Sequence, residues 1–132
     1  VHPDEGFRAA SETAEQQLRF FDSQPPEVQV EFLMSSIDEL DESADMLDGL
    51  VKHWAVGDVA ALEADLVSDM KSEYPDLYKV LLVDRNAAWA KTLAERLKGS
   101  GVSFVSVGSA HLIGNDSVQT FLAREGIKAE RY

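Results

Sequence analysis

Apolar residues in the first three quarters of the chain recur every three or four positions, which is the period of an amphipathic helix. In the opening segment these positions are Ala10, Ala14, Leu18 and Phe21. Pro25 and Pro26 then end that segment, and proline also suits the first turn of a following helix. The pattern therefore predicts a helix before Pro25 and a second helix after it.

The longest regular pattern runs from Val30 to Trp54, with steps that alternate between three and four residues. Its members are Val30, Leu33, Ile37, Leu40, Ala44, Leu47, Val51 and Trp54. This heptad spacing has two interpretations: the seam of a coiled coil, or the buried stripe of one long helix or of two consecutive helices. Ser and Asp residues within 41–45 could cap a new helix, so a break there fits the pattern.

Further helices are expected up to residue 99. Gly57 is expected to close one helix and Asp58 to cap the next, which Pro75 ends or restarts. A short apolar helix over 75–84 and a helix over 85–98 follow, and Gly99 and Gly101 supply the stop.

The hydrophobic period changes after residue 100. The segment 102–107 (VSFVSV) is β-branched and aromatic and predicts a buried strand. A helix capped by Asp116 and ended by Gly126 should follow, and then a short strand over 127–132. We therefore expect an α/β fold: one domain over residues 1–132, helical over 1–99, with a βαβ unit over 101–132.

Two strands do not make a stable sheet. The edge beside 102–107 is therefore expected to pair with something outside this sequence. A two-fold homodimer is the simplest solution, and further segments of the same polypeptide are the alternative.

Charge and composition narrow the classes of partner. The chain of 132 residues carries a net charge of −12, with 19 acids and 4 bases in residues 1–76 but 5 acids and 8 bases in 77–132. Such acidity disfavours DNA, RNA and anionic membranes. The acidic half is interpreted either as a solvated helical surface or as a patch for a basic partner. The chain contains no cysteine, and no apolar run is long enough to span a membrane.

His111 is the candidate for chemistry. It follows the predicted strand by a few residues in the pattern Gly108-Ser109-Ala110-His111, and ligands collect at that edge of α/β sheets. An imidazole there could bind a metal ion or move a proton, and an ordinary polar contact is the alternative.

Several spaced motifs resemble the TraB/PrgY/GumN family, to which the Tiki metalloproteases are related. The matching elements are Glu12-Thr13 with Gln16, the stretch "HWAVGDVAALE", Arg85-Asn86 with Trp89, the Gly108–Leu112 motif with Gly114, and the closing "LAREGIKAERY". The resemblance covers about residues 9–132.

The resemblance implies a divalent-metal site (Mn²⁺, Co²⁺ or Zn²⁺) and peptidase-like hydrolysis of a peptide or protein. It implies that His111, Glu12 and Asn86 hold the metal and that Arg85 and Glu12 serve catalysis. It also implies a bacterial, periplasmic or envelope-linked setting. The family pattern has two G-x-x-H motifs, and His111 corresponds to the second. The sequence departs from this pattern because neither His2 nor His53 belongs to a first G-x-x-H motif.

Three functions follow from these observations. The first is a metal-dependent hydrolase of this family whose site is incomplete in this chain. The second is a non-catalytic helical module that dimerises or binds a protein partner. The third is a structural protein built on the heptad seam. We also expect Glu12, Arg85, Asn86 and His111 to converge, since the N-terminal turn of the 86–98 helix should lie near His111.

Overall fold

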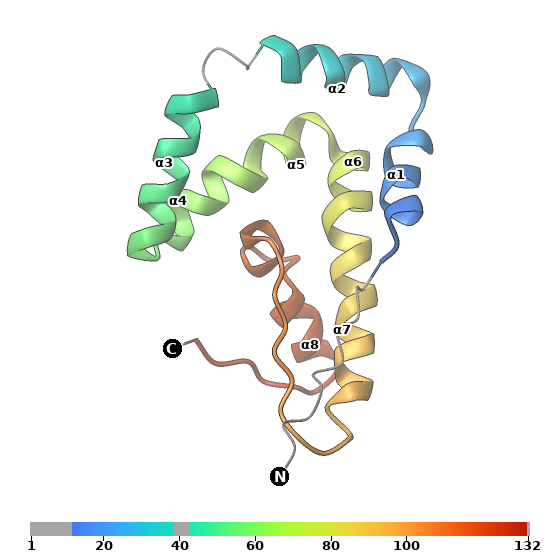
Figure 1. Ribbon diagram of the computed structural model, residues 1–132, viewed down its shortest axis with the longest axis vertical. Coiled ribbons are helices and arrows are strands. Elements are labelled where there is room, and N and C mark those ends of the chain that lie inside the picture. The colour runs from blue at the N-terminus through green and yellow to red at the C-terminus, as the bar shows by residue number, and fades with distance from the viewer. Residues whose placement is uncertain (1–11, 39–42, 132) are drawn as a thin grey trace, which may run out of the picture.

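A computed structural model describes residues 12–38 and 43–131, and the regular elements in these ranges are all helical (Figure 1). The α-helices are α1 (Ala14–Asp22), α2 (Pro26–Asp38), α3 (Ser43–Val56), α4 (Val59–Glu63), α5 (Asp69–Glu73), α6 (Pro75–Tyr78), α7 (Asp84–Arg96) and α8 (Val118–Arg124). Two π-helical turns, η1 (Ala64–Ser68) and η2 (Lys79–Val83), and one 3₁₀ turn, η3 (Ser109–Leu112), complete the order.

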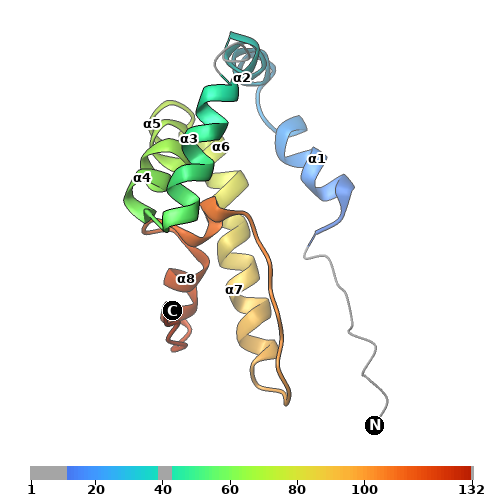
Figure 2. The same cartoon turned by 60° about the vertical axis from the view of Figure 1, so that its left-hand side comes forward.

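The π-helical turns join short helices into longer ones. The backbone stays in the right-handed helical region at Ala64 and Asp69 and again at Lys79 and Asp84, so 59–73 and 75–96 are each one continuous helix. The second of these helices is the long vertical element in both views (Figures 1 and 2). It carries the predicted site residues Arg85 and Asn86 directly after the π-turn, a place where functional groups are often found.

Several helix ends lie where the sequence predicts them. Gly57 adopts a φ of 68°, and the side chain of Asp58 accepts a hydrogen bond from the Ala61 amide. Pro26 opens α2 and Pro75 occupies the first turn of α6. These predictions are confirmed because each rests on the local backbone preference of one residue.

The core lies between the two continuous helices and η3. Its buried members are Leu62, Val67, Tyr78, Leu82 and Ile113. Helix α8 packs against α7, and Ala90 and Ala94 of α7 and Val118 of α8 are buried. No helix in the described ranges combines the length and the apolar character that crossing a membrane requires.

The predicted strand over 102–107 is wrong. These residues run back along α7 without helical or ladder hydrogen bonds, and Arg96 donates to the Ser103 hydroxyl at 2.8 Å (Figure 2). Val102 and Phe104 are 102% and 93% exposed. The β-branched pattern gives an extended backbone, but a strand also needs a neighbour, and the described residues offer none.

The α/β class and the βαβ unit over 101–132 are therefore wrong as well. Residues 127–131 also form no ladder, so the described chain is helical with two irregular extended segments. The predicted cap Asp116 is a further correction. Ser117 occupies the N-cap position of α8, while the Asp116 carboxylate binds Lys71 and Tyr78. That carboxylate is used for a tertiary contact, which local sequence does not reveal.

The heptad pattern is divided between α2 and α3, which lie at an angle to each other (Figure 1). The interpretation as a buried stripe fails, because the six members whose side chains are described are about half exposed or more: Val30, Leu33, Ile37, Leu47, Val51 and Trp54. Leu40 and the side chain of Ala44 lie outside the described part. The inward face of α2 is instead made by Val28 and Phe32.

Candidate functional site

The four predicted site residues lie together at the junction of η2, α7 and η3. Arg85 and Asn86 come from the first turn of α7, His111 from η3, and Glu12 from the residue before the cap of α1. A capping box between Thr13 and Gln16 fixes the start of α1 and thereby holds Glu12 next to α7. The expected convergence is therefore observed, while the chemical roles of the four residues stay predictions.

His111 and Asn86 form the buried half of the cluster. His111 is 8% exposed and Asn86 is 1% exposed, and the His111 Nδ1 lies 2.6 Å from Asn86 Oδ1. The Asn86 amide group donates through Nδ2 to the carbonyl oxygen of Asp116 at 2.7 Å, which fixes Oδ1 as the acceptor. The proton of a neutral His111 therefore sits on Nδ1, and its Nε2 presents a lone pair.

Electrostatics keep His111 neutral. The pKa of His111 is lowered from 6.5 to about 4: burial is the largest cause, the nearby Arg85 guanidinium also lowers this pKa, and Glu12 opposes the shift. At neutral pH this imidazole is an acceptor or a ligand rather than a charged group. Its Nε2 makes no hydrogen bond to the described residues, while Nδ1 is bonded to Asn86.

Arg85 and Glu12 form the second half of the cluster. The Arg85 Nε donates to both Glu12 carboxylate oxygens, at 2.9 and 3.0 Å, and its Nη1 donates to the Leu81 carbonyl oxygen at 2.9 Å. The guanidinium also stacks on the rings of Phe20 and Trp89. Arg85 therefore ties the start of α1 to the long helix through its Nε.

Trp89 joins the two halves. Its ring lies 4.6 Å from the His111 ring and 4.9 Å from the Arg85 guanidinium carbon, measured to the ring centroids. The indole Nε1 is buried and has no acceptor among the described residues. The sequence named Trp89 only as part of a motif. Its spacing of four residues from Arg85 places both side chains on one face of α7 and could have predicted this contact.

A second polar group supports the loop that carries His111. Tyr78 donates its hydroxyl to Asp116 at 2.9 Å, and Lys71 binds the same carboxylate oxygen at 3.0 Å. The hydrogen bonds from Lys71 and Tyr78 lower the pKa of Asp116, while burial and that same carboxylate raise the pKa of Tyr78. Residues so far apart along the chain gave no common sequence signal, and this anchor was missed.

A hollow of about 300 Å³ lies beside the cluster, between α1, η1 and η2. Its wall includes Arg85, Phe20, Leu81 and Ala110, the residue before His111. Apolar walls next to a few polar groups are typical of sites that bind small molecules or side chains.

The described residues do not fit a complete divalent-metal centre. No group of three or more histidine or carboxylate side chains gathers anywhere in the described ranges. Glu12 is bound to Arg85, and both polar ends of the Asn86 amide are used by His111 and Asp116. A histidine that binds a metal through one ring nitrogen usually donates the N–H of the other to an oxygen. Among the candidate ligands only His111 is arranged in this way, with Nε2 as the nitrogen that could bind a metal. A catalytic centre normally needs about three protein ligands.

These observations define a class of protein: a helical chain in which a buried, neutral histidine is hydrogen-bonded to an asparagine amide, beside an arginine–carboxylate ion pair. The chain belongs to the TraB/PrgY/gumN family, whose model matches residues 8–131. No curated protein matches the chain. No solved structure matches it either.

Proposed function

We propose that this chain contributes the histidine-bearing part of a peptidase-like hydrolase site, and that groups outside the described residues complete that site. The observation that carries the proposal is the orientation of His111. Asn86 binds its Nδ1–H, burial keeps the ring neutral, and Nε2 keeps a lone pair. The expected localisation in the bacterial periplasm or envelope belongs to this proposal and rests on the family alone.

Two features beside His111 support binding of a peptide-like ligand. The hollow lined by Phe20 and Leu81 would accept an apolar side chain. The Trp89 ring, 4.6 Å from the His111 ring, adds a second apolar surface beside the imidazole.

The direct test is hydrolysis of a fluorescent casein by this chain, without metal and with Mn²⁺, Co²⁺ or Zn²⁺. Activity should be lost in His111→Ala and kept in His53→Ala, because His53 is bound to Asp65 on the surface, away from the cluster. Activity that survives His111→Ala would refute the assignment. Absence of hydrolysis under all four conditions would show that this chain does not catalyse the reaction alone.

A specific observation favours that second function, a module that dimerises. Residues 102–107 form no backbone hydrogen bond to any described residue, although their sequence is β-branched and aromatic. Val102 and Phe104 are also almost fully exposed, and exposed apolar segments of this kind are typical of interaction sites. In a two-fold dimer with Phe104 near the axis, the two Phe104 side chains would lie close to each other.

The absence of cysteine makes this dimer testable by cross-linking. A disulfide forms where two cysteines approach with Cβ atoms about 3.5–4.5 Å apart, as residues beside a two-fold axis can. Phe104→Cys should therefore give a disulfide-linked dimer under mild oxidation, and Val56→Cys, an exposed control, should not. Equal cross-linking of both variants would show random collision and would contradict the dimer.

A further inference from the structure

The outward face of α2 is a continuous apolar stripe. Val30, Leu33, Met34 and Ile37 follow the spacing i, i+3, i+4, i+7 and are 59%, 59%, 50% and 48% exposed. The opposite face of the same helix packs inward through Val28 and Phe32. Helix α2 thus presents two apolar faces, and only one of them is covered in the described structure.

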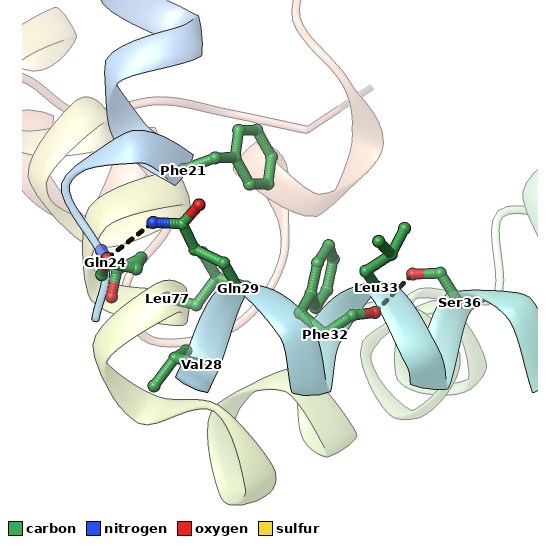
Figure 3. Close-up of a pocket in the computed structure, with 8 residues that line it drawn as sticks. All are labelled: Phe21, Gln24, Val28, Gln29, Phe32, Leu33, Ser36 and Leu77. Carbon is green, nitrogen blue, oxygen red and sulfur yellow. Dashed lines mark hydrogen bonds between the residues drawn. The ribbon is translucent and has the colours of Figure 1, made fainter. Parts of the chain in front are cut away.

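A groove opens along one edge of this stripe (Figure 3). It has a volume of about 240 Å³ and lies between α1, α2 and α6. Its apolar wall is made by Phe21, Val28, Phe32, Leu33 and Leu77. Leu33 belongs to both the stripe and the groove, so the two form one surface that could take a side chain projecting from a partner.

The other edge of the stripe is acidic. Glu27, Glu31 and Asp38 are spaced by four and seven residues and therefore line one side of α2, next to Met34. All three are exposed, and none forms an ion pair within the described ranges. The polar residues that line the groove, Gln24, Gln29 and Ser36, are all neutral.

We propose that the outward face of α2 binds a basic amphipathic helix of a partner protein. An apolar side chain of the partner would enter the groove beside Leu33. Its lysine or arginine residues would lie over Glu27, Glu31 and Asp38. This arrangement is the helix-in-groove form of recognition, with charge complementarity along one edge.

Charge disfavours two other occupants of this surface, a second copy of α2 and an anionic membrane. In an antiparallel pair of two α2 helices, each acidic edge would face the acidic edge of the other copy, and like charges oppose such pairing. The net charge of −12 adds to this repulsion. An anionic membrane surface would repel the same edge. The inference does not rest on the histidine site, whose residues Arg85 and Asn86 lie midway along the continuous helix 75–96.

The test uses a fluorescent peptide of roughly 18 residues, long enough to form a helix, with leucines at i, i+3, i+4 and i+7 and lysines elsewhere. Anisotropy measures its binding to the whole chain. Leu33→Gln with Ile37→Gln should weaken binding by tenfold or more, as expected for two apolar anchors. If circular dichroism shows lost helicity, Val30→Gln with Met34→Gln repeats the test at similarly exposed positions.

The charged edge is tested by Glu27→Gln, Glu31→Gln and Asp38→Asn together. Binding should weaken roughly fivefold to thirtyfold, the sum expected of three exposed charge pairs. A matched triple, Glu95→Gln, Glu125→Gln and Glu130→Gln, removes the same charge elsewhere and should weaken binding by less than about threefold, through long-range attraction only.

Several results would overturn the proposal. Equal weakening by the two triples would show general charge attraction, as would equal binding of a peptide with the same composition in strict alternation. A homodimer that Ile37→Gln dissociates would make a second copy the occupant. Binding to vesicles containing phosphatidylserine that the stripe variants abolish would make it a membrane.

Discussion

Individual buried residues hold the candidate site together. Asn86 is the centre, since one side chain satisfies His111 on one side and the Asp116 carbonyl on the other. Tyr78 and Lys71 in turn bind the carboxylate of Asp116. His111 therefore keeps its place through a chain of polar contacts that begins on the long helix and ends on the loop before α8.

Replacing Asn86 by alanine should destabilise the protein by about 2–4 kcal/mol, because two buried polar groups would lose their partners. The measurement is urea unfolding at neutral pH. Thr92→Ala is the control on the exposed face of the same helix and should stay within about 0.5 kcal/mol. A loss below about 0.5 kcal/mol in Asn86→Ala would mean that the pair contributes no net stability.

Acid should destabilise the fold through His111. The pKa of His111 falls from 6.5 to about 4 on folding, so the unfolded chain binds the extra proton between these values. The unfolding free energy therefore has its full value, as far as His111 is concerned, above about pH 6.5. It decreases as the pH falls towards 4. The loss is on the order of 3 kcal/mol.

This pH dependence is measured by urea unfolding from about pH 7 to pH 4.5. Carboxylates also titrate in this range, so the informative quantity is the difference between the wild type and His111→Gln. The difference in unfolding free energy between the two proteins should shrink as pH falls. A difference that stays constant would contradict the lowered pKa.

At the scale of elements, the turn after η3 positions the site from the other side. Gly114 adopts a φ of 74°, and a Cβ added there would lie 2.9 Å from the Glu63 Oε1. That approach joins the end of η3 to α4. Gly114 therefore sets the distance between the loop that carries His111 and the core helices.

Gly114→Ala should lower stability by about 1–2 kcal/mol, through backbone strain and displacement of Glu63. Gly49→Ala should have the opposite sign. Gly49 lies inside α3 with open space around it, so alanine should stabilise by up to about 1 kcal/mol. Thermal unfolding of the two variants distinguishes these signs, and a neutral Gly114→Ala would show that the turn carries no constraint.

Sequence reasoning succeeded where one residue decides the outcome and failed where a partner element does. The starts at Pro26, Asp58 and Pro75 follow from local backbone chemistry. The strand over 102–107 required a neighbour that the pattern could not supply. The convergence of Arg85, Asn86 and His111 was expected from their order along the chain. The amide that orients the imidazole depends on three-dimensional packing and was not foreseen.

At the scale of the whole molecule, charge and exposed apolar surface are the distinguishing properties. The N-terminal part is strongly acidic and the C-terminal part is slightly basic. Large apolar side chains stay exposed on α2, on α3 and over 102–105. Exposed apolar surface of this kind is typical of interaction sites, which supports the proposal that α2 binds a partner helix.

Self-repulsion of the acidic charge should make stability depend on salt. Raising NaCl from about 20 mM to about 300 mM should increase the unfolding free energy by about 0.5–1 kcal/mol, because screening relieves repulsion at a net charge of −12. Guanidinium is itself a salt, so urea is the suitable denaturant. A decrease in stability would mean that attractive surface pairs such as Lys79–Asp84 outweigh the repulsion.

The central claim is that Asn86 and burial hold His111 as a neutral imidazole with its proton on Nδ1 and a lone pair on Nε2. Nitrogen-15 NMR of the histidine side chains tests it most directly, with His111→Gln to assign the signal and Asn86→Ala to release it. We predict the Nδ1–H form at neutral pH, protonation only near pH 4, and a mixture of tautomers in Asn86→Ala. A proton on Nε2, or a titration midpoint near 6.5 in the wild type, would contradict the account.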